Sequence, residues 1–294
     1  MIRSQAAPRR RASSRFSYWL HRNGRKIAAY IFLILGGTGM FIPFLWMVST
    51  SLKRPGSVFT YPPRWIPRPP CWTNYLLVFQ LTPFARYMGN TATYATLATV
   101  GQLLSCSLGG FVFARLRFPS RNLIFLALLA TMMVPYQVTM IPTFILFKTL
   151  GWLDSYNPPI VPAFTGGAFG VFLLRQYFLT IPFEVVDAAK IDGAGWLTIY
   201  WRIFLPLAMP ALATLGIFSF MAAWNDLLGP LIYLNSMGKY TVSIALAFYQ
   251  GQHKVDWSTL MAASIISLTP VLILYFAGAQ KYFVQGIATV GIKR

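Results

Sequence analysis

Long apolar stretches alternate with short polar segments along this chain of 294 residues. About 20 helical residues cross the roughly 30 Å of hydrocarbon in a bilayer. Six stretches are long and apolar enough to do so, at residues 27–47, 91–113, 123–147, 160–179, 204–233 and 259–283. The pattern therefore predicts an all-α membrane protein with six transmembrane helices.

Prolines divide this pattern. Six of them fall between the first two apolar stretches, at Pro55, Pro62, Pro63, Pro67, Pro69 and Pro70. Proline fixes φ and has no amide donor, so this segment is expected to be an extended outer loop. Pro135 and Pro142 lie inside the third apolar stretch and are expected to kink it.

The composition supports a membrane protein. Hydrophobic residues make up 56% of the chain and charged residues only 11%, whereas about a quarter of a soluble domain is charged. The net charge of +19 comes from cations that lie between apolar stretches and at the termini. Such placement indicates control of membrane topology, and no nucleic-acid partner is expected.

The distribution of cations also predicts the orientation. With six spans, both termini lie on one side, and that side carries most of the 25 Lys and Arg residues, beginning with the basic tail 1–26. The positive-inside rule therefore places both termini in the cytoplasm. The alternative of a cleaved signal peptide is disfavoured, because the first apolar run is too long and no small-residue cleavage site follows it.

The sequence offers little for catalysis or metal binding. Cys71 and Cys106 are expected at different membrane depths, and His21 and His253 are far apart in the chain. No G-x-x-x-x-G-K-[ST] motif is present, so the chain is not expected to bind ATP. With six acidic residues and no catalytic signature, it is expected to be neither an enzyme nor a cofactor-binding protein.

The polar segment 182–206 has helical signals of its own. Thr180 is a candidate N-cap, Pro182 suits a first turn, and Glu184 places negative charge near the helix start. Glu184, Asp187 and Lys190 share one face. Asp192–Gly193 is a stop signal, and a second helix over 195–203 leads to Pro206. The pattern predicts a helix-turn-helix, which composition alone would describe as an amphipathic linker in the headgroups.

This segment closely resembles the EAA…G…I-LP loop of permease subunits in binding-protein-dependent ABC importers. The matching string is Glu184-Val-Val-Asp187-Ala188-Ala189-Lys-Ile-Asp192-Gly193-Ala194, followed by Ile203-Phe-Leu205-Pro206. Asp187 stands where the family usually has glutamate, which shortens the reach of the acid by one methylene. Other strings resemble the carbohydrate-uptake branch, and specifically the shorter permease of the maltose and glycerol-3-phosphate type: 170–178, 224–226 and 286–293.

The resemblance implies a type I ABC importer permease fold in the bacterial cytoplasmic (inner) membrane, with a cytoplasmic coupling loop between helices 4 and 5. It also implies a division of the chain into a basic tail (1–26), a first helix with a proline-rich outer loop (27–83), a permease core (84–286) and a cytoplasmic C-terminal tail (287–294). The implied partners are a homologous permease as heterodimer, two ATPase subunits that carry ATP and Mg, and an extracytoplasmic solute-binding protein.

The resemblance implies roles for particular residues. Those implied to dock the ATPase are Glu184, Asp187, Ala188, Ala189, Asp192, Gly193, Leu205 and Pro206. The C-terminal tail is implied to reach between the ATPase subunits through Gly286, Thr289, Gly291 and Lys293, the alternative being a frayed cationic terminus. Residues implied to contact a gate or the binding protein are Asn225, Asp226, Tyr249, Gln250, Gly251 and Gln252.

Four alternatives stay open or are disfavoured on the sequence. Asn225 and Asp226 are equally compatible with an interfacial position, and Gln102 and Gln137 with interhelical hydrogen bonds instead of a translocation path. A permease for another solute class fits the same loop. A stand-alone secondary transporter needs an ion-coupling acid in a broken helix, for which Asp226 is the candidate. In the maltose system the sugar site belongs mainly to the other permease, so no sugar contact is expected here.

Overall fold

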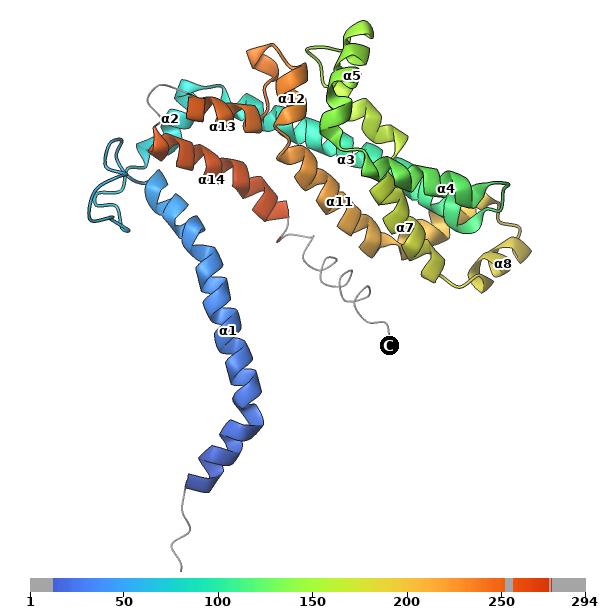
Figure 1. The fold of residues 1–294 in the computed structure, drawn as a ribbon, viewed down its shortest axis with the longest axis horizontal. Coiled ribbons are helices and arrows are strands. Elements are labelled where there is room, and N and C mark those ends of the chain that lie inside the picture. The colour runs from blue at the N-terminus through green and yellow to red at the C-terminus, as the bar shows by residue number, and fades with distance from the viewer. Residues whose placement is uncertain (1–12, 252–255, 275, 277–294) are drawn as a thin grey trace, which may run out of the picture.

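The computed structural model describes residues 13–251, 256–274 and 276. The described residues form helices joined by loops, without a β-strand (Figure 1). In chain order the helices are α1 (Ser13–Ser51), α2 (Thr73–Leu81), α3 (Phe84–Arg115), α4 (Arg121–Ala130), η1 (Thr131–Met133), α5 (Tyr136–Thr149), α6 (Asn157–Ile160), η2 (Val161–Thr165), α7 (Ala168–Thr180), α8 (Glu184–Ile191), α9 (Trp196–Ile199), η3 (Tyr200–Phe204), α10 (Leu205–Leu207), α11 (Met209–Trp224), α12 (Leu228–Tyr233), η4 (Met237–Lys239), α13 (Val242–Gly251) and α14 (Trp257–Leu274).

Four helical segments in the described part of the chain are long and apolar enough to cross a membrane: Ala28–Ser51, Phe84–Arg115, Asn157–Thr180 and Trp257–Leu274. They correspond to the predicted first, second, fourth and sixth spans. Two bent helix pairs bring the total to six if each pair is one span. The predicted all-α architecture is therefore confirmed. The part of the predicted sixth span beyond residue 276 lies outside the described residues.

The predicted third span is broken. The segment Arg121–Met133 meets Tyr136–Thr149 at 98°. Pro135 explains the break, because the residue before a proline avoids the helical region, and Val134 is extended at φ −85° and ψ 113°. Pro142 lies inside α5, which continues through it. The predicted kink is thus confirmed at Pro135, whereas at Pro142 the helix is not interrupted.

The predicted fifth span, 204–233, is not one helix. Trp196–Leu207 and Met209–Trp224 meet at 78° around Ala208, with Pro206 and Pro210 on either side of the bend. Beyond α11 the chain leaves helical structure at Asn225 and resumes as the short α12. The prediction of a continuous helix was wrong because the apolar run conceals these two breaks.

The helices that follow α1 pack together into one unit, here called the body. Helix α3 is its central helix, and α7 and α11 pack along α3. Glycines allow this close packing. A Cβ built on Gly110 would lie 3.0 Å from the Leu174 Cβ and from the Arg175 amide nitrogen. On the other side, a Cβ on Gly170 would lie 2.6 Å from the Cys106 sulfur. The α3–α7 contact therefore has no room for larger side chains.

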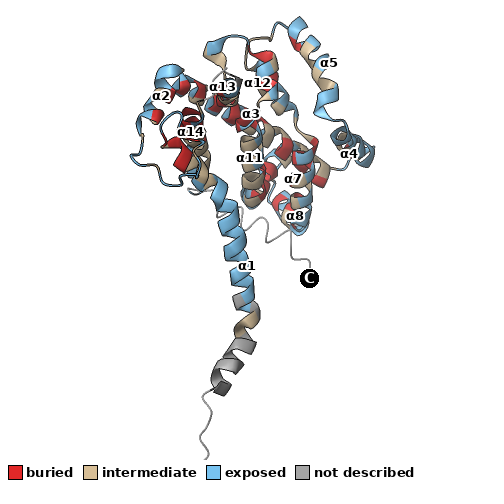
Figure 2. Ribbon diagram, turned by 60° about the vertical axis from the view of Figure 1, so that its left-hand side comes forward, coloured by how far each residue is buried: buried red, intermediate tan, exposed pale blue. Residues whose placement is uncertain are grey.

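Helix α1 differs from the others because it leaves the body as an arm (Figure 1). Its neighbour in the body is α14. Figure 2 shows that the buried residues gather in the body and that the arm is exposed along most of its length. The most apolar 18-residue stretch of its span has no buried residue, and the buried residues of the span are Ser49–Ser51 at its end. Such a surface needs lipid or another protein to cover it.

The loop between α1 and α2 is non-helical, as the prolines predicted. Asn74 fastens it, because its amide donates to the carbonyls of Ser51 and Lys53 at 2.7 Å each. Cys71 and Cys106 are both free thiols, which agrees with the expectation that they do not pair.

Candidate functional site

Helix α8 is the first element of the polar segment 182–206, which is called the docking segment below. It begins at Glu184, two residues later than predicted. Thr180 is not its N-cap: Thr180 ends α7, and its hydroxyl donates to the Tyr177 carbonyl at 2.7 Å. Glu184 and Asp187 instead place negative charge in the first turn, where it interacts favourably with the positive end of the helix dipole.

The end of α8 is a complete Schellman turn. Gly193 has φ +82°, a conformation that glycine adopts without steric cost. Its amide donates to the Lys190 carbonyl at 3.0 Å, and the Ala194 amide donates to the Ala189 carbonyl at 2.9 Å. These are the two hydrogen bonds that define the motif. The predicted stop at Asp192–Gly193 is therefore confirmed.

Helix α8 has an inner and an outer face. Val186, 0% exposed, and Ala189 point into the largest apolar cluster, where Phe178, Ile199 and Phe204 also lie. The outer face carries Glu184, Asp187, Ala188, Lys190 and Asp192. Ala189 thus packs inward, so this residue of the predicted docking set is not on the exposed surface of α8.

The second half of the docking segment, which begins with α9, folds back on α8. The Lys190 ammonium lies 3.9 Å from the Trp196 ring centroid, an attraction between a cation and the ring's π face. The chain then continues through a π-helical stretch, Tyr200–Phe204, which buries both its first and its last residue. Leu205 is half-buried and Pro206 is exposed.

Arg115, at the end of α3, holds this arrangement in place. It is 4% exposed, and its guanidinium donates to the carbonyls of Phe178 and Ile181, at the end of α7. It also lies over the rings of Phe183 and Phe204, at 5.2 and 4.9 Å. Arg115 therefore fixes the chain directly before α8. Sequence reasoning missed this role, since the residue stood out only as one of several topology-setting cations.

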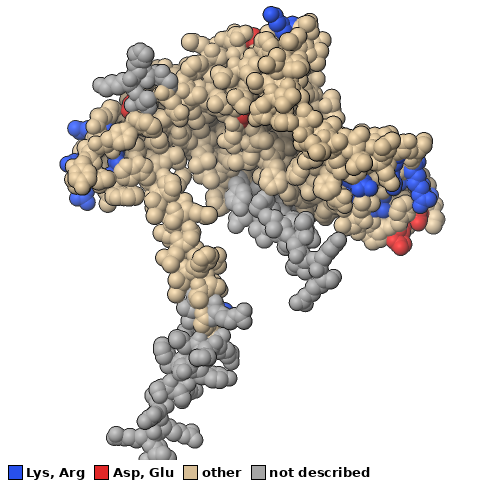
Figure 3. Space-filling view, viewed as in Figure 1, with Lys and Arg blue, Asp and Glu red and all other residues tan. Residues whose placement is uncertain are grey.

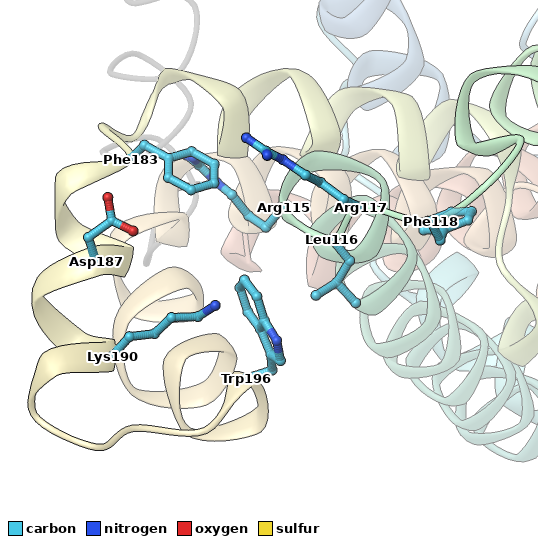
Figure 4. Close-up of a pocket in the computed structure, with 8 residues that line it drawn as sticks. All are labelled: Arg115, Leu116, Arg117, Phe118, Phe183, Asp187, Lys190 and Trp196. Atoms are coloured by element: carbon cyan, nitrogen blue, oxygen red, sulfur yellow. The ribbon is translucent and has the colours of Figure 1, made fainter.

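An open pocket of about 780 Å³ lies between α8 and the end of α3 (Figure 4). Asp187 and Lys190 border it from α8, and Arg115 and Arg117 from the α3 side. Figure 4 shows Phe183 beside Arg115, and Lys190 and Trp196 turned toward one another. An acidic residue and three cations thus face a cleft wide enough to receive side chains of another protein.

A second cavity, of about 430 Å³, lies between α3, α5 and α11. Asp226 borders it and accepts hydrogen bonds from the Tyr94 hydroxyl at 2.9 Å and the Gly229 amide at 3.1 Å. Gln102 also borders this cavity, whereas Gln137 is exposed elsewhere. Asn225 is exposed and its amide donates to the Met221 carbonyl at 2.8 Å.

The remaining predicted contact residues are only partly described. Tyr249 is buried on α13, with its hydroxyl 3.3 Å from that of Thr82, whereas Gln250 is exposed and Gly251 ends the helix. Their contact with a binding protein stays a prediction. Those that lie outside the described residues are Gln252, Gly286, Thr289, Gly291 and Lys293.

Residues 106–289, which include α8 and both breaks, match the family of inner membrane components of binding-protein-dependent transport systems. The sn-glycerol-3-phosphate transport system permease of Yersinia pestis is 33% identical over 276 residues, covering 91% of this chain and 97% of the relative. The chain belongs to this permease family. The arabinooligosaccharide transport permease of Halalkalibacterium halodurans is 32% identical to this permease, over 83% and 86% of the two chains.

A solved structure has the same fold as this permease. It is a chain of a bacterial ABC transporter that imports the acidic polysaccharide alginate, with a TM-score of 0.77 at 23% identity, covering 94% of this permease and all of that chain. The fold and the family therefore agree with the resemblance seen in the docking segment. In the described part of the permease, no group of His, Cys, Asp and Glu residues is placed to hold a metal ion.

Proposed function

We propose that this permease is the membrane subunit of an ATP-driven importer for a sugar or related solute that a binding protein delivers. The family is defined by binding-protein-dependent transport, and two relatives serve glycerol-3-phosphate and arabinooligosaccharides. The permease pairs with a homologous subunit, and two ATPase subunits supply ATP and Mg. Both termini lie in the cytoplasm, where the C-terminal tail contacts the ATPases.

One observation carries the docking part of this proposal. The inner face of α8 is locked by Val186 and Ala189, while Glu184, Asp187 and Ala188 face outward without a described partner. Arg115 and the Schellman turn hold both ends. A helix that is fixed inside and exposed outside transmits a push from a partner to the body of the permease, so α8 and the adjoining pocket are the ATPase docking site.

The exposed arm α1 supports the pairing with a second permease. The apolar span Ala28–Ser51 has buried residues only at its C-terminal end, Ser49–Ser51, and therefore has ample surface for lipid and for a neighbouring subunit. Tight helix packing in membranes favours such association where surfaces fit.

The test is co-purification of the ATPase with Asp187→Lys and Gly193→Trp variants. Breaking a buried charged contact costs about 2–5 kcal/mol, which is roughly a 30-fold loss of affinity or more. We expect both variants to insert into the membrane but lose ATPase association and uptake. Thr149→Lys, at an exposed position at the end of α5, is the matched control. Retention of the ATPase by both variants would refute the docking site.

Transport by the purified permease alone, in vesicles without an ATPase, would instead support a stand-alone secondary transporter. Uptake that depends on the ATPase but follows a binding protein for an unrelated solute would support an importer of another solute class.

A further inference from the structure

The cavity between α3, α5 and α11 lies away from the docking helix and has the size of a small-molecule site. Its volume of about 430 Å³ falls in the range of roughly 300–1,000 Å³ that is typical of ligand pockets. Tyr94 and Gln102 reach it from α3, Tyr136 from the start of α5, and Ser219 from α11. Asp226 closes one end, at the break after α11.

Hydrogen-bonding groups in this cavity are available to a ligand. Neither Gln102 nor Ser219 has a side-chain hydrogen-bond partner among residues 13–251, 256–274 and 276, although both are half-buried. The Gln102 amide is held beside Gly167, where a Cβ would lie 2.3 Å from its nitrogen. Glycine at this position therefore leaves the space that the amide occupies.

The Asp226 carboxylate has a fixed orientation, but its oxygens can accept further hydrogen bonds. Tyr94 donates to one of its oxygens and the Gly229 amide to the other. A carboxylate oxygen has two acceptor sites, so each oxygen retains one for another donor. The nearly buried Tyr94 fixes the direction of the carboxylate through this hydrogen bond. The cavity thus presents two acceptor sites, an amide and a hydroxyl, with the Tyr136 ring at its edge.

The charge of the cavity decides which solutes it accepts. Among the described residues that line it, Asp226 is the charged one, and none is Lys or Arg. Figure 3 shows the cationic side chains gathered at the ends of the molecule, with few on the middle of the face it presents. An anion in the cavity would face the Asp226 carboxylate without a cation among the described lining residues, which is unfavourable.

We propose that this cavity contacts the transported solute and selects a neutral, hydroxyl-rich molecule, a sugar or polyol, over an anion. This departs from the expectation, taken from the maltose system, that no sugar contact lies in this chain. Hydroxyl donors would fill the open acceptor sites of Asp226, and Gln102 and Ser219 would take further hydroxyls. This inference rests on the proposed import function and deepens it. It also separates the permease from its relatives named for sn-glycerol-3-phosphate, which is an anion.

The first test measures the electrostatic potential of the cavity. Ala222 is exposed at its edge, so Ala222→Cys, with Cys71→Ser and Cys106→Ser, gives a reporter thiol in the assembled transporter. Its labelling rates with cationic trimethylammonioethyl and anionic sulfonatoethyl methanethiosulfonate are compared, each relative to a free thiol. We expect about a tenfold preference for the cation, and Asp226→Asn abolishes it. A preference for the anionic reagent overturns the proposal.

The second test uses protection of the same thiol in the detergent-solubilised transporter. Glycerol and arabinotriose are expected to slow labelling, and sn-glycerol-3-phosphate is not. Gln102→Leu weakens protection by the neutral probes, whereas Gln137→Leu, outside the cavity, leaves it unchanged. Equal or better protection by sn-glycerol-3-phosphate, or protection by no probe, overturns the proposal.

The two proposals fail in different ways. If the permease does not couple to an ATPase, the unmodified chain does not co-purify with one, whatever the labelling shows. If the cavity does not contact the solute, co-purification is intact and the protection pattern is absent or reversed.

Discussion

Replacing Arg115 by methionine tests whether this residue holds α8, the proposed docking helix, in place. The change keeps most of the side-chain volume but removes the guanidinium that donates to the carbonyls of Phe178 and Ile181. It also removes the cation that lies over Phe183 and Phe204. The chain between α7 and α8 would then lose its polar anchor while its apolar contacts remain.

The size of the effect follows from these contacts. A hydrogen bond from a charged donor contributes about 1.5–3 kcal/mol, and a desolvated cation–π contact contributes up to about 2 kcal/mol. Part of this is recovered because water from the adjoining pocket can reach the freed carbonyls. A net local loss of about 3 kcal/mol corresponds to roughly a hundredfold change in the opening equilibrium.

Amide hydrogen exchange over α8 in the assembled transporter measures this opening directly. We expect Arg115→Met to raise exchange in α8 about a hundredfold and to weaken ATPase association, while α3 and α11 exchange as before. Arg117→Met is the matched control, because Arg117 lines the same pocket, is exposed, and donates no hydrogen bond to the described residues. Unchanged exchange in Arg115→Met, or an equal effect of both variants, would show that Arg115 does not position the helix.

Three further predictions concern the body and its loops. Gly110→Leu should lower the thermal midpoint by overpacking α3 against α7, at a cost of about 1–3 kcal/mol, whereas Gly89→Ala, with open space around it, should not. Hydrogen bonds from Ser236 and Lys239 hold the pKa of Asp154 below its usual range. The stabilisation that these bonds give to η4 is therefore fully present above about pH 3.9 and is lost as the pH falls further. Amide hydrogen exchange in η4 should show this pH dependence, and Asp154→Asn should abolish it. Burial lowers the pKa of Lys53, whose buried ammonium has no hydrogen-bond partner among the described residues, so Lys53→Met should leave the thermal midpoint unchanged or raise it; a fall would contradict this reasoning.

The sequence predicted those parts of the structure whose cause is local. Gly193 ends α8 because its own backbone takes positive φ, and Pro135 breaks the third span because of its effect on Val134. Likewise the polar spacing of Glu184, Asp187 and Lys190 placed all three on the exposed side of α8. In each case the residue and its neighbours suffice to determine the conformation.

The sequence did not predict what depends on distant partners. Arg115 acts on carbonyls more than sixty positions away along the chain, and nothing in its own surroundings points to them. Thr180 had the chemistry of an N-cap, but its hydroxyl bonds within α7 instead. Helix α13 lies outside the six predicted apolar stretches, and its burial against α2, α3 and α14 depends on how those helices are assembled.

The glycine contacts between α3 and α7 have a mechanical consequence. Gly110 and Gly170 bring α3 and α7 into close contact, and α8 packs against the same cluster, so we expect α3 and α7 to move together as one rigid unit. A rigid unit of this kind transmits a displacement without bending. We therefore expect the bending that accompanies a transport cycle to fall on the two breaks, at Pro135 and around Ala208, where the helices are already interrupted.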